Sequence, residues 1–341
     1  MELQSQSLVV VPLSDEERLS GKLTLEHIGQ AVAALHRDGL VVLENAVDVR
    51  HMDRLNGILS SEATEMAKLP TTHFNNNSVD GRPTGNMSQG PPLVPEFMYD
   101  DIWANEPASE VLSAMLGPNP VVNYVNGNTA LGGFDGARQF VHADLTFNFN
   151  PMPFGIVANY YLVDASPANG STELWVGSHK NTTFADCRNC TEEVSQDFGI
   201  RFELLEERRA YAPPIQPVVK KGSVVLRDLR VWHAGLSNPS PDPRIMLAFV
   251  HTPWWYEAGA KVVLPESARS KVESWASRTH APVSYRAHFV PAELDHKKVK
   301  FTPNFNSRNK GYNSVLPDLP MGFIFPEPES EAAAKPKNVT A

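Results

Sequence analysis

The stretch Val141-His142-Ala143-Asp144-Leu145 is the part of this sequence that decides the fold. It is a short apolar run that carries a histidine and an aspartate two residues apart, and such a run predicts a β-strand. Side chains at positions i and i+2 of a strand leave the same face, so His142 and Asp144 should converge on one point. An imidazole and a carboxylate at one point are two of the three ligands in the facial triad that holds non-haem iron(II). The third ligand should be a distant histidine, and His233, which follows the apolar run at 224–226, fits that position.

Two other copies of the His-x-Asp pattern lie in segments that predict helices. His36 and Asp38 end a run whose apolar residues have helical spacing, and His51 and Asp53 open a second such run. On a helix, positions i and i+2 diverge by about 200°, so neither pair can converge on one ion. We interpret both pairs as solvated helix residues.

The composition is that of a soluble globular protein. The chain has 341 residues, of which 42% are hydrophobic and 20% are charged, and its net charge is −9. This acidic balance argues against nucleic acid or an anionic membrane as the main partner, because both require basic clusters. The first residues lack the pattern of a signal peptide and no apolar stretch reaches the length of a membrane span, so we expect a cytoplasmic protein.

The two cysteines, Cys187 and Cys190, form a lone C-x-x-C. This is the spacing of a redox pair or of half a zinc site. The sequence has no second cysteine pair and no surrounding βαβ pattern, which favours ordinary reduced thiols in a loop.

The pattern of the chain predicts one domain over 1–325. A helical N-terminal buttress spans 24–69, with Thr24 and Asp48 as expected helix caps and a buried strand at 40–43 between the helices. The fold of the first 22 residues cannot be predicted from their polar, irregular sequence. An extension at 256–325, with a helix expected at 265–278, follows the core, and 326–341 has the composition of a disordered tail.

The segment 71–95 is rich in Asn, Gly and Pro and is too long for a simple connector. Loops of this length in compact domains are commonly lids or disordered segments. If the segment is a lid, Met87 and Gln89 would face a bound ligand. A solvated loop without a role is the alternative interpretation.

Short strand-like runs divided by Gly, Pro, Asn and Ser dominate the segment from about 120 to 255. This density favours a mainly β fold with flanking helices, built as a sandwich or a jelly roll. No G-x-G-x-x-G, Walker A, G-x-S-x-G or H-E-x-x-H string is present, which disfavours nucleotide, serine-hydrolase and zincin functions. The expected strands lie at 121–125, 140–145, 156–163, 171–176, 218–219, 224–226 and 245–251.

Further motifs identify a family. Arg244 opens a strand eleven residues after His233, and its guanidinium is a rigid fork suited to a carboxylate. With Asn169-Gly170-Ser171-Thr172-Glu173, Gly177-Ser178-His179 and Gly222-Ser223-Val224-Val225, the sequence from about 25 to 255 resembles the phytanoyl-CoA dioxygenase-like (PhyH) branch of the iron(II)/2-oxoglutarate oxygenases. It looks closest to fungal members that tailor natural products.

The resemblance implies that the core is a double-stranded β-helix, that is, a cupin-like jelly roll with flanking helices. It also assigns roles residue by residue. It implies that His142, Asp144 and His233 bind iron and that Arg244 holds the far carboxylate of 2-oxoglutarate. Four further residues match positions near that co-substrate: Thr172, Gln139, Tyr124 and Asn159. Gln139 could equally contact the substrate. The substrate wall is expected from Phe147 and Phe149, from the 71–95 segment with Met87 and Gln89, and from the region past Trp254, whereas His179 is expected to be structural.

The implied reaction converts 2-oxoglutarate and dioxygen to succinate and carbon dioxide. At the same time it hydroxylates, desaturates or rearranges a small apolar or polycyclic molecule, in fungal secondary-metabolite biosynthesis. An acyl-CoA substrate is less favoured because the sequence lacks a dense Lys/Arg cluster. Two alternatives stay open: a metal-dependent lyase or isomerase that does not use 2-oxoglutarate, and a non-catalytic jelly-roll subunit of a partner oxygenase. The sequence is compatible with a homodimer or a heterodimer.

Overall fold

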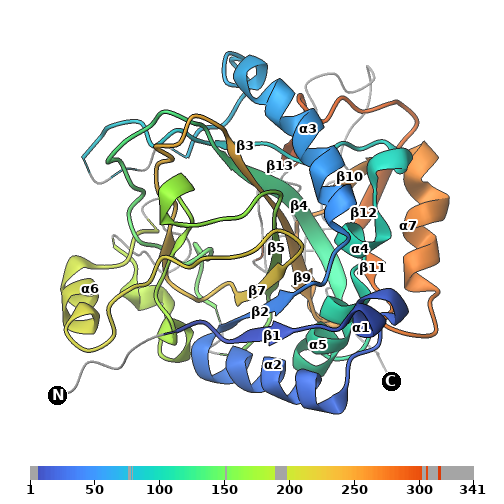
Figure 1. The fold of residues 1–341 in the computed structure, drawn as a ribbon, viewed down its shortest axis with the longest axis horizontal. Coiled ribbons are helices and arrows are strands. Elements are labelled where there is room, and N and C mark those ends of the chain that lie inside the picture. Colours follow the sequence, from blue (N-terminus) through green and yellow to red (C-terminus); the bar gives the residue numbers. More distant parts are fainter. Residues whose placement is uncertain are drawn as a thin grey trace, which may run out of the picture.

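The computed structural model describes residues 7–75, 78, 80–149, 152–188, 198–301, 305 and 314–315. Within these residues, eight strands form one large mixed sheet in the order β1-β2-β7-β5-β9-β4-β11, with β3 paired to β4 (Figure 1). Their bounds are β1 Val10–Pro12, β2 Leu40–Glu44, β3 Asn86–Ser88, β4 Val121–Ala130, β5 Ile156–Tyr161, β7 Val224–Asp228, β9 Arg244–Thr252 and β11 Ser284–Tyr285. Three smaller sheets pair β6 Glu173–Leu174 with β8 His233–Ala234, β10 Val262–Pro265 with β12 Ala287–Val290, and β13 Lys300–Phe301 with β14 Ser314–Val315.

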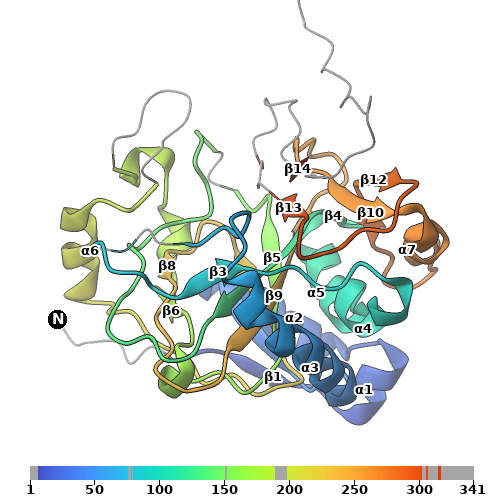
Figure 2. The same cartoon turned by 90° about the horizontal axis from the view of Figure 1, so that it is seen from above.

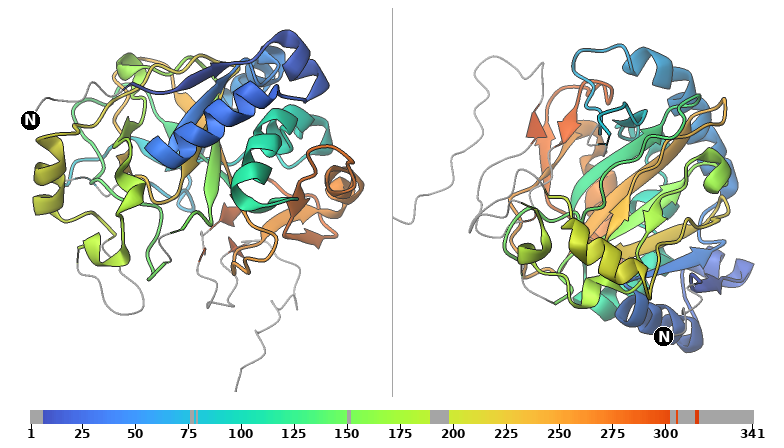
Figure 3. Two further views of the ribbon diagram at one scale, coloured as in Figure 1. Left: turned by 90° about the horizontal axis from the view of Figure 1, so that it is seen from below. Right: turned by 90° about the vertical axis from the view of Figure 1, so that its left-hand side faces the viewer.

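The two faces of the large sheet have different roles. On β9, the alternate residues Ile245, Leu247 and Phe249 are buried in the main hydrophobic core, which they share with residues of the helices. The residues between them face the opposite side and line a cavity. This division follows from the period of two in a strand. Figures 1 and 3 show α6 and α7 at opposite ends of the molecule.

The helices of the structure are short to medium in length. Their bounds are α1 Asp15–Ser20, α2 Leu25–Asp38, α3 Val49–Met66, α4 Asp100–Trp103, α5 Glu106–Leu116, α6 Phe202–Arg209 and α7 Arg269–Ala276. No helix among the described residues is long and apolar enough to span a membrane.

The expected helix caps are confirmed. Thr24 accepts a hydrogen bond from the N–H of His27, and α2 ends at Gly39, which has the left-handed φ of 80° that suits glycine. Asp48 accepts from the N–H of Arg50 at the start of α3. Figure 2 shows α2 and α3 on the same side of the molecule.

Residues 7–22, whose fold could not be predicted from the sequence, form part of the fold. Strand β1 extends the sheet edge parallel to β2. Ser14 begins α1 with a capping box, in which its hydroxyl accepts from the N–H of Glu17 while the Glu17 carboxylate accepts from the N–H of Ser14. The same carboxylate also accepts from the N–H of Thr24 and contacts the ring of His27, so it joins the starts of two helices.

Replacing Glu17 by glutamine is expected to lower the free energy of unfolding by about 1–2 kcal/mol at neutral pH. Burial would raise the pKa of Glu17, but the hydrogen bonds from Thr24, Ser14 and His27 outweigh it and lower the pKa to about 2. A depressed folded pKa stabilises the protein fully above the ordinary value of 4.5, and this contribution is lost as the pH falls towards 2. Urea unfolding of both proteins should therefore show a difference that shrinks in acid.

The exposed Glu16 on the same helix provides the control. The Glu16→Gln variant should match the wild type at all pH values, and an equal effect of both substitutions would contradict the role given to Glu17.

Several expected elements differ in detail from the structure. Residues 140–145 do not form a ladder strand, because His142 makes only isolated bridges to His233 and Gly199. The 71–95 segment contains β3, which pairs with β4 over three residues. The expected strand at 171–176 shortens to β6, and 218–219 makes one bridge, from Val219 to Ala165. The tail at 326–341 and Cys190 lie outside the described residues, and Cys187 is buried.

Candidate metal centre

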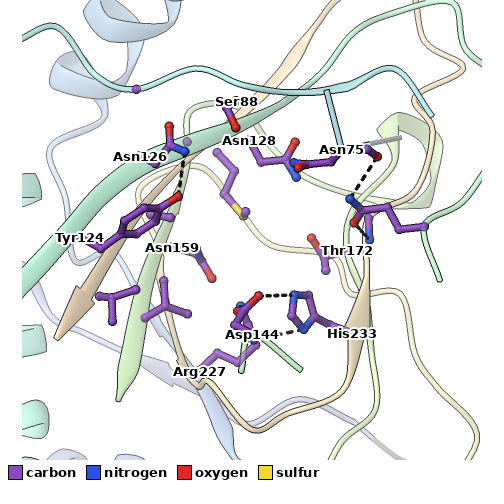
Figure 4. Close-up of a pocket in the computed structure, with 18 of the residues that line it drawn as sticks. Asn75, Ser88, Tyr124, Asn126, Asn128, Asp144, Asn159, Thr172, Arg227 and His233 are labelled. Carbon is purple, nitrogen blue, oxygen red and sulfur yellow. Dashed lines mark hydrogen bonds and ion pairs between the residues drawn. The ribbon is translucent and has the colours of Figure 1, made fainter. Parts of the chain in front are cut away.

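Three side chains from separate parts of the chain meet at one point on the cavity wall. The Nε2 atoms of His142 and His233 lie 3.8 Å and 3.4 Å from Oδ1 of Asp144. All the candidate ligand atoms lie within 4.8 Å of one another. No other group of three or more His, Cys, Asp or Glu residues in the described part of the chain meets this criterion. Figure 4 shows Asp144 and His233 pointing toward each other.

The backbone fixes this arrangement. His142 and His233 exchange two N–H to carbonyl hydrogen bonds of 3.0 Å and 2.9 Å, and the N–H of Asp144 donates to the carbonyl of Leu229. The exchange ties the first ligand segment to β8, although neither segment belongs to the large sheet. The spacing of two still places His142 and Asp144 on one side because the segment is extended.

Hydrogen bonds of the rings leave the Nε2 atoms available. Nδ1 of His142 lies 3.0 Å from the carbonyl of Phe140, and Nδ1 of His233 lies 3.1 Å from that of Val231. A ring whose Nδ1 donates its proton to a carbonyl presents an unprotonated Nε2, which is the form that binds metals.

The electrostatics of the site favour a neutral His142 beside an ionised carboxylate. Burial, together with the neighbouring His233, lowers the pKa of His142 to about 3. Burial alone would raise the pKa of Asp144, but the neighbouring His233 and the positive charge of Arg227 hold this pKa well below its ordinary value. A neutral His142 ring and an anionic oxygen of Asp144 therefore face the same point near neutral pH.

Arg227 is a site residue that the sequence reasoning missed. Its Nη2 lies 2.7 Å from Oδ2 of Asp144, and its Nη1 lies 3.3 Å from Nδ1 of His233. The expected strand ended at 226, one residue before it. The sequence signal is the spacing of two between Val225 and Arg227, which places both side chains on the face of β7 that lines the cavity.

A cavity of about 660 Å³ extends from these ligands across the free face of the large sheet. Strand pairing places Asn126, Ala248 and Asn159 in one row across this face, with Val225 at its end. The next row holds Tyr124, Val250, Val157 and Arg227. The cavity floor therefore combines amide groups with small apolar side chains (Figure 4).

Arg244 lies at the start of β9 with the parity of the cavity-facing residues and is 1% exposed. Its Nη2 donates to the carbonyl of Gly170 at 2.8 Å, and its guanidinium stands 5.4 Å from the ring centroid of Tyr161. Its Nε and Nη1 have no hydrogen-bond partner among the described residues. The hydroxyl of Tyr161 lies 3.0 Å from that of Thr172, which lines the cavity. A buried guanidinium with two donors that no described residue pairs with is suited to bind an anion.

A family comparison agrees with this geometry. The model of the family "Phytanoyl-CoA dioxygenase (PhyH)" matches residues 35–246, which is most of the chain and includes all three candidate ligands and Arg244. The chain belongs to the PhyH family. Its identification from sequence as an iron- and 2-oxoglutarate-dependent dioxygenase of this family is confirmed.

Solved structures similar to this PhyH protein include two enzymes of low sequence identity. The epimerase SnoN, in complex with Fe3+, alpha ketoglutarate and nogalamycin RO, is 15% identical with a TM-score of 0.50, covering 67% of this chain and 85% of SnoN. EctD from S. alaskensis, with 2-oxoglutarate and 5-hydroxyectoine, is 19% identical with a TM-score of 0.48, covering 68% of this chain and 76% of EctD. The expected jelly-roll fold with flanking helices is confirmed.

The other residues expected near the co-substrate of this PhyH protein all line the cavity. Gln139 already bonds the chain, since it accepts from the N–H of Gly235 at 2.8 Å and its amide lies 3.3 Å from the carbonyl of Asn75. Tyr124 accepts from Asn126, and burial raises the pKa of Tyr124 to about 12, so its hydroxyl stays protonated. The side chain of Asn159 points into the cavity (Figure 4).

The residues expected to form the substrate wall have other positions. Met87 packs with Ala63 and Met66 on α3, and buried Gln89 bonds the carbonyl of Leu59 and the hydroxyl of Thr129. Phe147 and Phe149 belong to a hydrophobic cluster that borders the cavity, since its members Val157, Leu229 and Val250 line it. None of these four lies among the described lining residues. Other residues of the 71–95 segment and of the region past Trp254 do line the cavity, including Thr71, His73, Asn75, Ser88, His296, Lys297, Val299 and Phe305.

His179 lies away from the metal ligands. It is buried, and its Nε2 contacts the carbonyl of His36 at 3.2 Å, which ties the turn after β6 to the end of α2.

Proposed function

We propose that this protein oxidises a small neutral organic molecule with iron(II), 2-oxoglutarate and dioxygen, releasing succinate and carbon dioxide. The observation that carries the proposal is the meeting of His142, Asp144 and His233 on the cavity wall. It is joined by the buried guanidinium of Arg244, whose position on β9 has the parity of the cavity-lining residues and whose Nε and Nη1 have no partner among the described residues.

The residues present fit both groups. His142 and His233 would hold the metal through Nε2 and Asp144 through Oδ1, which leaves further positions open. The two unused donors of Arg244 match a carboxylate, and Thr172 lies nearby through Tyr161. Iron(II) and 2-oxoglutarate, when bound, would supply the electrons that activate dioxygen, which is the oxidant. The protein positions them, shields the cavity from water and presents one bond of the substrate.

The substrate, as a finer proposal, is a natural product of secondary metabolism rather than an acyl-CoA. The Lys and Arg residues among the described lining residues are Arg227 and Lys297, and both lie beside carboxylates, of Asp144 and Glu62 respectively. Neither is available for a string of phosphates. The floor formed by Asn126, Ala248 and Asn159 suits a molecule with both apolar surface and hydrogen-bonding groups.

Succinate formation tests the proposed function. Purified protein reconstituted with iron(II) under anaerobic conditions should bind one metal per chain. It should form succinate from 2-oxoglutarate after oxygen is admitted, and faster with a substrate. A metal-dependent conversion without succinate would establish the lyase or isomerase instead. Failure to bind iron stoichiometrically would favour the non-catalytic subunit.

A further inference from the structure

We infer that Arg227 is a positioning residue that restricts Asp144 to binding the metal through a single oxygen. This inference rests on the proposed function, because it concerns how the ligand set presents itself to iron. Arg227 is the next-to-last residue of β7, where it pairs with β2 on one side and β5 on the other, and it is 6% exposed.

The two oxygens of Asp144 have different partners. Oδ1 faces the two imidazoles, at 3.8 Å from Nε2 of His142 and 3.4 Å from Nε2 of His233. Oδ2 is turned away from them and lies 2.7 Å from Nη2 of Arg227. A charge-assisted hydrogen bond of this length between a buried guanidinium and a carboxylate is strong and directional. It engages Oδ2 and opposes the rotation that would bring both oxygens to the metal.

Arg227 also borders the second ligand. Its Nη1 lies 3.3 Å from Nδ1 of His233, which at the same time lies 3.1 Å from the carbonyl of Val231. Nδ1 cannot donate to the carbonyl and accept from the guanidinium at once. When Nε2 is the metal-binding atom, Nδ1 carries the proton, so Arg227 then packs against the ring without donating a hydrogen bond to it.

The charge of Arg227 has a second consequence. The guanidinium neutralises the carboxylate, so Asp144 and Arg227 together carry no net charge before a metal binds. This lets a buried site exist with its ligands already in place. The same positive charge repels a divalent cation. Arg227 therefore weakens metal binding while it keeps a coordination position open that a two-oxygen carboxylate would occupy.

The test measures metal affinity and co-substrate binding together. In Arg227→Met, a near-isosteric neutral side chain frees Oδ2 and removes the charge. We expect the affinity for manganese(II), measured by equilibrium titration in mildly alkaline buffer, to rise on the order of 10- to 100-fold. Losing an outer partner of a metal ligand ordinarily lowers metal affinity over this range, and the sign is reversed here because the lost partner is a cation that repels the metal. The 2-oxoglutarate affinity of the manganese-loaded variant should fall over the same range. Arg227→Lys keeps the charge and should bind manganese(II) as the wild type does.

The sign of the change in manganese(II) affinity distinguishes a positioning role of Arg227 from a purely structural role. A structural role alone predicts weaker metal binding, because a loosened site loses affinity. Arg230 is the matched control. It is a buried arginine on the connection between β7 and β8, it pairs with Asp228 at 2.7 Å, and it is not one of the residues that line the cavity. Arg230→Met should lower the melting temperature at least as much as Arg227→Met but leave metal affinity unchanged.

The outcomes distinguish a failure of the role given to Arg227 from a failure of the proposed function. Weaker or unchanged manganese(II) binding by Arg227→Met, with wild-type binding intact, would overturn the inference about Arg227 only. Absence of metal binding by the wild type would overturn the proposed function itself. If Arg227→Met fails to fold, Arg227→Gln, which keeps one donor without the charge, should still show tighter metal binding than Arg227→Lys.

Discussion

Replacing Asp144 by alanine should abolish stoichiometric iron(II) binding and reduce succinate formation by more than about 100-fold, since losing a direct ligand should exceed the roughly 10- to 100-fold cost of losing an outer partner. Asp144 provides the one anionic oxygen that faces both imidazole Nε2 atoms, and two neutral nitrogens alone hold a hard divalent ion weakly. Iron content after anaerobic reconstitution and succinate yield are the measurements.

The variant also leaves the Arg227 guanidinium buried without its carboxylate, which costs stability. A melting curve should accompany each measurement, and the double variant Asp144→Ala/Arg227→Met removes this complication. Asp53→Ala is the matched control, because Asp53 belongs to another His-x-Asp and lies on α3, where it pairs with Lys221. It should bind iron as the wild type does. Undiminished succinate formation by Asp144→Ala would remove the metal assignment.

Replacing Arg244 by methionine should raise the 2-oxoglutarate concentration needed for half-maximal activity by about 30-fold or more, because a buried, hydrogen-bonded charge pair is worth roughly 2 kcal/mol or more. Burial lowers the pKa of Arg244, yet an arginine stays cationic in proteins, so the free protein holds a charge with two unused donors. Removing that charge should leave the melting temperature of the free protein unchanged or higher, while 2-oxoglutarate binding falls.

Arg230→Met is again the informative comparison. It breaks the buried pair with Asp228 and should lower stability without changing the 2-oxoglutarate requirement. Arg244→Lys keeps a point charge but loses the planar fork, so it should recover part of the lost affinity. An unchanged 2-oxoglutarate requirement in Arg244→Met, with altered affinity for the substrate, would show that this arginine serves the other ligand.

Local rules of the chain made much of the fold predictable. Thr24, Gly39 and Asp48 mark helix ends through caps that depend on neighbouring residues only, and these ends were expected. The convergence of His142 and Asp144 needs only an extended backbone, so it persists although 140–145 makes isolated bridges instead of a ladder.

The remaining features depend on contacts between distant segments, which periodicity does not encode. Strand β1 is too short to read alone and exists because β2 offers a free edge. Gln89 has the chemistry of a ligand contact, but its amide bonds Leu59 and Thr129, which lie 30 and 40 residues away in sequence. Arg227 could have been found by extending the alternation of β7 by one residue, but its partner Asp144 could not, because 83 residues separate them.

The division of the large sheet into a helix-packed face and a cavity face gives this architecture room to diversify. On β9, Leu247 and Phe249 support the core, while Ala248 between them lines the cavity. An exchange at Ala248 or Asn159 can therefore reshape what the enzyme accepts at little cost to folding. Such cavity-lining positions, which hold neither the metal nor its co-substrate, can follow a new substrate while their neighbours along the strand keep the scaffold constant.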